Sequence, residues 1–170
     1  MGLFLYKPNN MLHIYQKTVT NPISFKGIGL HSGKSSKIII QPGIEDQGII
    51  FKRVDLDQNN LINANYESVS SAKLCTTLEN NHGIKVSTVE HLLAAMYIAG
   101  IDNATVEIDN EEVPIMDGSA KDFLDIFRKE EIKILTKKRK YLKVLEKVEL
   151  LDGGRRISIE PSENFLEVDF

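Results

Sequence analysis

The chain has 170 residues, of which 42% are hydrophobic and 26% are charged, which suits one compact domain or two small ones. Its net charge of −3 argues against a nucleic-acid-binding protein, because such a protein would carry a basic face. The single cysteine, Cys75, excludes an internal disulfide and is typical of a reducing compartment. No apolar run reaches the length of a membrane span, so we expect a cytoplasmic location.

The first part of the chain predicts an extension followed by two strands. Residues 1–13 lack a signal peptide and are expected to form a flexible N-terminal extension, in which Met11 is a second candidate start. Residues 14–30 alternate loosely between apolar and polar side chains, and Asn21-Pro22 interrupts them.

The glycine-rich stretch Gly29-Leu-His-Ser-Gly33 invites a phosphate-binding-loop interpretation. That motif needs glycine at position 28, which is Ile28, and a helix after the loop. The residues that follow, Lys37–Gln41, read instead as a strand. We therefore predict a β-hairpin turn with His31 exposed near its tip.

The middle of the chain alternates short strand patterns with polar segments. Strands are predicted over Gln47–Arg53, Lys73–Leu78 and Ile84–Val86, and residues 55–72 are expected to form an irregular insert. A cysteine in such a strand is more often a small buried side chain than a nucleophile, and this holds for Cys75.

Residues 87–99 predict an amphipathic helix, with Val89, Leu92, Leu93 and Met96 on one face and Gly100 as its stop. Glu90 and His91 lie in its first turn. A carboxylate beside an imidazole suits metal-assisted hydrolysis, in which the histidine holds zinc and the carboxylate takes a proton from water. The same residues also fit a capping box, in which Glu90 reaches back to the N–H of Ser87 and His91 is an ordinary half-buried side chain.

After this helix the sequence predicts a strand over Ala104–Ile108, a turn at Asp117-Gly118 and a second helix capped by Ser119. Gly118 is expected to need a positive φ. The apolar face of the second helix comprises Phe123, Ile126 and Phe127. A charged linker, Arg128–Lys133, should follow this helix.

The C-terminal part repeats an earlier pattern. Arg156-Ile-Ser-Ile-Glu-Pro161 resembles Lys37-Ile-Ile-Ile-Gln-Pro42, and the strand pattern of Phe165–Phe170 resembles that of Ile49–Arg53. The chain would then hold a first domain over 14–129, followed over 130–170 by a linker and the first strands of a second, incomplete copy. A sheet without a covering layer is not a finished domain, so we expect a truncated sequence.

Five motifs follow one another along the chain: Gly29–Gly33, Leu74–Thr76, Ser87–Ala95, Gly100–Asn103 and Pro114–Ala120. In this order they resemble the zinc-dependent UDP-3-O-acyl-N-acetylglucosamine deacetylases of lipid A biosynthesis. The resemblance runs from about residue 16 to the last residue. It implies an α+β fold of two βααβ domains, each a small sheet packed on two helices.

The resemblance also implies an activity and a role for each site residue. The family removes the acetyl group from the glucosamine nitrogen, with His91 matching a zinc ligand and Glu90 the general base. His31, Leu74 and Cys75 match positions that line the substrate pocket. The expected substrate is an acylated UDP-amino sugar, and neither nucleic acid nor a membrane span is expected.

The family's remaining ligands, a histidine and an aspartate, and its general-acid histidine belong to the second domain and have no counterpart here. Three protein ligands are usual for catalytic zinc, so one histidine would hold it weakly. We therefore expect activity only with a complementary second-domain polypeptide. The alternative is a catalytically silent fragment or binding module that retains only the first-domain fold.

Overall fold

The computed structural model describes residues 14–162, 168 and 169; the predicted extension, 1–13, lies outside them. The described residues form a mixed α+β structure with several small sheets and two helices. The chain divides into two units, of which the first ends at Arg139 and the second begins at Lys140. Among the described residues, no helix is both long enough and apolar enough to cross a membrane.

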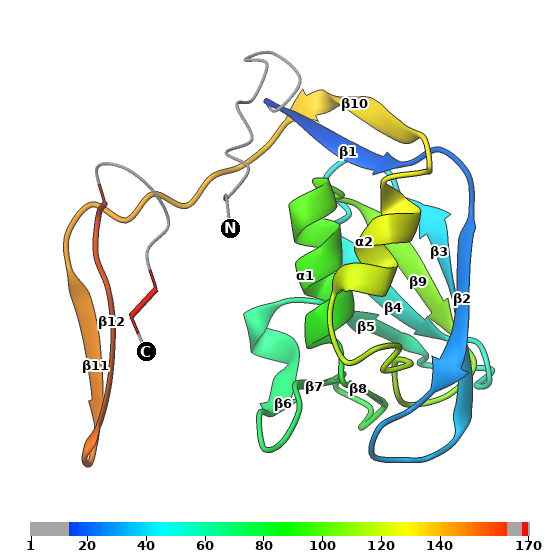
Figure 1. The fold of residues 1–170 in the computed structure, drawn as a ribbon, viewed down its shortest axis with the longest axis horizontal. Coiled ribbons are helices and arrows are strands. Elements are labelled where there is room, and N and C mark those ends of the chain that lie inside the picture. The colour runs from blue at the N-terminus through cyan, green and yellow to red at the C-terminus, as the bar shows by residue number, and fades with distance from the viewer. Residues whose placement is uncertain (1–13, 163–167, 170) are drawn as a thin grey trace. The chain divides into compact units, whose positions relative to one another are not determined.

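A five-stranded sheet forms the centre of the first unit (Figure 1). All neighbouring pairs are antiparallel except β4 (Ile49–Arg53) and β9 (Ala104–Ile108), which run parallel because the chain passes through the insert and helix α1 (Glu90–Ala99) between them. Alternate residues of each strand face the core, as in β9, whose Ala104, Val106 and Ile108 are buried. In sheet order the strands are β2 (Ile23–Ile28), β3 (Ser35–Pro42), β9 (Ala104–Ile108), β4 (Ile49–Arg53) and β5 (Leu61–Asn63).

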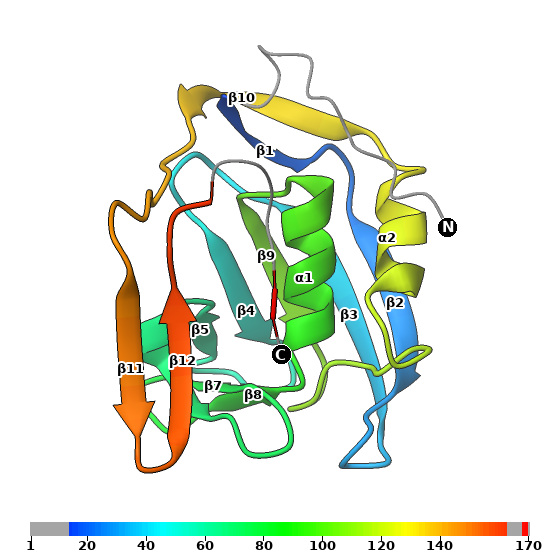
Figure 2. The same cartoon turned by 60° about the vertical axis from the view of Figure 1, so that its left-hand side comes forward.

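Two helices, α1 (Glu90–Ala99) and α2 (Lys121–Phe127), lie side by side on one face of this sheet (Figures 1 and 2). The predicted apolar face of α1 is confirmed, since Val89, Leu92 and Met96 are buried in the core and Leu93 packs against it partly buried. From α2, Phe123 packs against Phe25 of β2 with ring centroids 5.0 Å apart. The core therefore lies between the helices and the sheet.

Two smaller sheets lie at opposite ends of the helical layer (Figure 2). At the end where α1 begins, β8 leads directly into the helix and completes a three-stranded antiparallel sheet. A 3-10 turn, η1 (Tyr66–Ser68), precedes that sheet. At the other end, β1 and β10 pair antiparallel. The strands are β6 (Val69–Ser71), β7 (Thr77–Glu79), β8 (Lys85–Ser87), β1 (Tyr15–Val19) and β10 (Ile132–Lys138).

In the second unit, β11 (Val148–Asp152) and β12 (Arg155–Ile159) form an antiparallel hairpin. Its register pairs Val148 with Ile159 and Leu150 with Ile157, so four apolar side chains share one face. All of the hairpin's residues are exposed. The repeated pattern lies in the second strand of a hairpin in both units, in β3 and in β12. The predicted strand over 165–170 lies largely outside the described residues.

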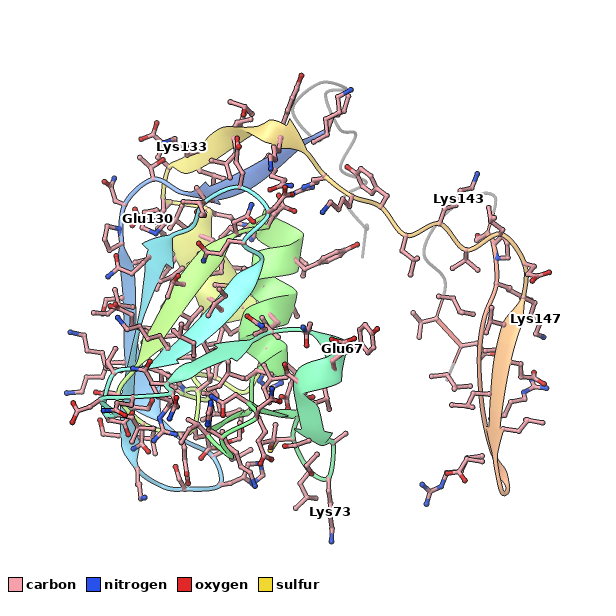
Figure 3. The ribbon with its side chains drawn as sticks, turned by 180° about the vertical axis from the view of Figure 1, so that it is seen from behind. Glu67, Lys73, Glu130, Lys133, Lys143 and Lys147 are labelled. Carbon is pink, nitrogen blue, oxygen red and sulfur yellow. The ribbon has the colours of Figure 1, made fainter. Side chains whose placement is uncertain are left out.

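Several predicted boundaries were wrong for local reasons. The strand predicted over Lys73–Leu78 begins only at Thr77, because Leu74 adopts a φ of 70°, which an extended strand does not allow. Lys73 projects from this bend into solvent (Figure 3). The predicted linker runs into β10 at Ile132. Ser119 does not cap α2 at its N-cap position, which is Ala120, although its hydroxyl accepts a 3.0 Å bond from the Lys121 N–H.

Candidate functional site

The start of α1 positions Glu90 and His91, the first two residues of the helix. A carboxylate is favourable there because it meets the partial positive charge of the helix N-terminus. The capping-box interpretation is wrong: Glu90 Oε2 accepts a 3.1 Å bond from the Thr76 N–H, and the Ser87 hydroxyl donates to the Glu111 carbonyl at 3.2 Å. Glu90 therefore ties the helix start to the segment before β7.

His91 is half-buried, and its Nδ1 is buried without a hydrogen-bond partner among the described residues. A buried imidazole nitrogen without a partner is unfavourable in the protein alone, and it is a suitable donor atom for a ligand or a metal. However, the part of the chain that the structure describes contains no group of three or more His, Cys, Asp or Glu side chains able to hold a metal ion. The described residues thus fit one zinc ligand and not a complete zinc site.

The segment that holds Leu74 and Cys75 reaches this helix start through Thr76. Besides the bond to Glu90, the Thr76 carbonyl accepts a bond from the Val89 N–H at 3.5 Å. Leu74 is 85% exposed, and Cys75 is half-buried with its Sγ 3.8 Å from the Thr77 hydroxyl. Leu74 is exposed and held at a strained positive φ, two residues before the Thr76 that bonds to Glu90, so its side chain is available to contact a ligand.

His31 lies exposed in the turn between β2 and β3, which confirms the predicted hairpin. The turn closes through the Gly33 N–H, which donates to the Gly29 carbonyl at 3.0 Å. The His31 N–H donates to Glu112 Oε1 at 2.9 Å. The structure therefore brings the His31 turn to the helix start indirectly, because Glu112 also contacts Thr88.

Glu112 is the residue whose role the sequence did not reveal. Its side chain is buried, and Oε1 accepts bonds of 2.9 Å from both the His31 N–H and the Thr88 hydroxyl. Its Oε2 accepts a 2.7 Å bond from the Ser32 N–H. Glu111-Glu112 reads as an exposed acidic pair after a strand, and no periodicity marks the second carboxylate as buried.

The electrostatics of Glu112 follow from these donors. Burial raises the pKa of the Glu112 carboxyl, but hydrogen bonds from His31, Ser32 and Thr88 outweigh burial and leave the pKa below its ordinary value. The side chain is therefore an anion at neutral pH. The hydrogen bonds from these donors compensate for removing the carboxylate from water.

A cavity of about 310 Å³ lies on the polar face of the β6–β7–β8 sheet. Hydroxyl and charged side chains line it, among them Ser70, Thr77 and the Glu79–Lys85 ion pair, whose atoms are 3.5 Å apart. None of the five predicted site residues belongs to its lining. The candidate site is therefore the helix start with its two adjoining segments, and not this cavity.

The fold and the site define a mixed α+β protein with a carboxylate–imidazole pair at a helix start. The family model for UDP-3-O-acyl N-acetylglycosamine deacetylase (LpxC) matches residues 16–170, and the chain belongs to this family.

Curated relatives agree with this assignment. The UDP-3-O-acyl-N-acetylglucosamine deacetylase of Geotalea uraniireducens is 47% identical over 87% of this chain and 48% of its own length. The corresponding proteins of Shewanella frigidimarina and Phenylobacterium zucineum are 41% and 39% identical over 92% of this chain. The matches cover 51% and 54% of those two relatives. The chain thus spans about half the length of the curated relatives it matches.

Proposed function

We propose that this chain contributes the N-terminal half of a zinc-dependent deacetylase that hydrolyses the N-acetyl group of UDP-3-O-acyl-N-acetylglucosamine. Its membership of the family supports the reaction. The observation that carries the proposal is the pairing of Glu90 with a half-buried His91 whose Nδ1 lacks a partner among the described residues. We infer a cytoplasmic location from the single cysteine and the family.

In this proposal Glu90 is the general base. Its Oε2 accepts the 3.1 Å bond from the Thr76 N–H, which orients the carboxylate, and the carboxylate can accept a proton from the attacking water. The backbone on both sides of Glu90 is fixed, since Val89 is buried in the core and the helix begins at Glu90. This rigidity favours general-base chemistry, which requires a carboxylate held in place.

His91 is the zinc ligand that this chain supplies. Zinc in such a site provides Lewis-acid chemistry at the amide carbonyl. The described residues offer no group of three His, Cys, Asp or Glu donors, so the remaining ligands would come from the half of the relatives' length that this chain does not match. His31, Leu74 and Cys75 would line the substrate pocket on the two segments that adjoin the helix start.

The domain plan is part of the same proposal. A first βααβ domain over 14–129 would be followed, over 130–170, by a linker and the first strands of a second copy, with an extension at 1–13. The similar positions of the repeated pattern in β3 and β12 support this plan.

The second candidate is a catalytically silent fragment or binding module. The absence of a three-donor group among the described residues favours it for the chain on its own. Metal analysis tests the ligand assignment: we expect little stoichiometric zinc in the purified chain, and tight one-to-one zinc would contradict that assignment. His91→Ala should remove what zinc binding the chain retains, whereas the matched control His82→Ala, at an exposed turn residue, should leave it unchanged.

The decisive experiment measures acetate release from the acylated UDP-amino sugar. The chain is assayed alone and after mixing with a polypeptide that covers the C-terminal half of the Geotalea relative. We expect turnover only in the mixture, and none when Glu90→Gln replaces the wild-type chain. If the mixture stays inactive although the two polypeptides form a complex, the silent-fragment candidate is correct.

A further inference from the structure

We propose that Glu112 is the positioning residue of the candidate site: its buried carboxylate fixes the start of α1, and with it Glu90 and His91, against the His31 turn. This inference rests on the proposed function in one respect, namely that Glu90, His91 and the His31 turn form a functional site. The contacts themselves join residues that are distant in sequence, because Glu112 bonds to His31 and Ser32 on one side and to Thr88 on the other.

The three partners of Glu112 require an acceptor. His31 and Ser32 direct backbone N–H groups at the carboxylate, and these can only donate; the hydroxyls of Thr88 and Ser32 donate to it as well. An ionised carboxylate has two acceptor oxygens and no donor, whereas a glutamine amide would direct an NH₂ group at one of these donors. The site is therefore built for an anion, and the neutral isostere leaves at least one donor without a partner.

Gly29 shows how closely the turn approaches the carboxylate. A Cβ at this position would overlap Glu112 Oε2 and the Ser32 hydroxyl oxygen. The turn therefore has room for the carboxylate only because residue 29 is glycine. Displacing the carboxylate from the turn side is thus a way to disturb it without changing Glu112 itself.

Thr88 shows what the carboxylate holds on the other side. Thr88 is buried at the junction of β8 and α1, and its φ of 57° is unfavourable for a β-branched residue. Its hydroxyl bond to Glu112, at 2.9 Å, lies two residues before Glu90. Loss of this bond would release the backbone strain at the point where the chain enters the helix, and the first turn of α1 would shift.

The test uses the isolated chain and measures backbone amide NMR signals and hydrogen exchange for wild type, Glu112→Gln and Glu111→Gln. In Glu112→Gln we expect exchange at His31 or Ser32 to accelerate by roughly tenfold or more, because a charge-assisted bond is lost. The amide signals of residues 88–91 should move in the native state. Glu111→Gln changes an exposed neighbouring carboxylate and should move neither set of signals.

Two further variants keep the test valid if Glu112→Gln fails to fold. Thr88→Val retains the shape and removes the hydroxyl, and we expect it to move the amide signals of His31 and Ser32 through Glu112. Gly29→Ala should move the signals of residues 88–91 from the opposite side. Unchanged signals across Glu112 in both variants would overturn the proposal.

None of these measurements needs zinc or substrate. A negative deacetylation assay would therefore leave the positioning role intact. Amide signals that do not respond to changes on the other side of Glu112 would remove that role and leave the deacetylase proposal standing.

Discussion

Arg139 forms an ion pair with Asp102, with Nε 2.8 Å from the carboxylate, and so ties the residue after β10 to the end of α1. A second nitrogen of Arg139 donates to the carbonyl of Gly100, the left-handed C-cap of the helix. Asp102 also accepts a 2.7 Å bond from the Lys17 N–H in β1. A cation beside the last carbonyls of a helix is favourable, so this cluster joins three elements at one point.

We predict that Asp102→Ala lowers the free energy of unfolding by about 1–3 kcal/mol, because the Lys17 amide and the Arg139 guanidinium each lose an acceptor. Urea denaturation of the two proteins measures the difference. Asp57→Ala removes an exposed carboxylate and is the control, with little expected change. Equal losses in the two variants would show that the cluster contributes no more than a surface charge.

The pKa of Glu112 predicts a pH dependence of stability. Its pKa in the folded state lies below the ordinary value of 4.5, so the ionised form stabilises the fold at neutral pH. This stabilisation is lost as the pH falls below the ordinary value and through the lowered pKa. We expect wild type to lose more unfolding free energy than Glu112→Gln between neutral pH and a pH below 4.5. Parallel stability curves for the two proteins would contradict this assignment.

Gly118 adopts a φ of 83°, as expected from its turn, and an added Cβ would meet no atom within 4 Å. The cost of Gly118→Ala is therefore one of backbone strain alone, about 1–2 kcal/mol. Asparagine tolerates this conformation better than alanine, so Gly118→Asn should be less destabilising. Thermal denaturation of the three proteins tests this order, and a melting temperature unaffected by alanine would refute it.

Replacing Phe123 should cause a large loss in the free energy of unfolding. Phe123 is fully buried and contacts the ring of Phe25, and Phe127 meets the same ring edge-on at a centroid distance of 5.8 Å. Phe123→Ala should cost about 3–5 kcal/mol, because it leaves a cavity between α2 and β2. Tyr97→Ala, at a position that is 87% exposed on α1, is the control and should cost little in the same chemical denaturation experiment.

The sequence predicts the elements whose side chains alternate between core and solvent. The strand Ala104–Ile108 and the apolar face of α1 follow from such periods, and Gly100 marks the end of the helix. Prediction from the sequence fails where contacts between distant residues determine an element or its boundary. The helix begins at Glu90 rather than Ser87, because Ser87 pairs in β8 and bridges to Glu112. The charged strand β10 forms because β1 offers it an edge.

The candidate site shows the same division. Glu90 and His91 are adjacent in sequence and lie together in the first turn of a helix that periodicity predicts. The burial of Glu112 depends on the Gly29 turn approaching from a strand far away in the sequence. A contact of this kind carries no local signal, so only the tertiary structure reveals it.

The pairing of β1 with β10 has a consequence for biosynthesis. These strands come from opposite ends of the first unit, so β1 leaves the ribosome early and its partner emerges only when the unit is nearly complete. Until then β1 presents unpaired backbone groups to other nascent chains. Closing so long a loop between the two strands also slows folding. Chaperone demand should accordingly fall in a rearranged chain in which β1 is moved to follow β10 directly.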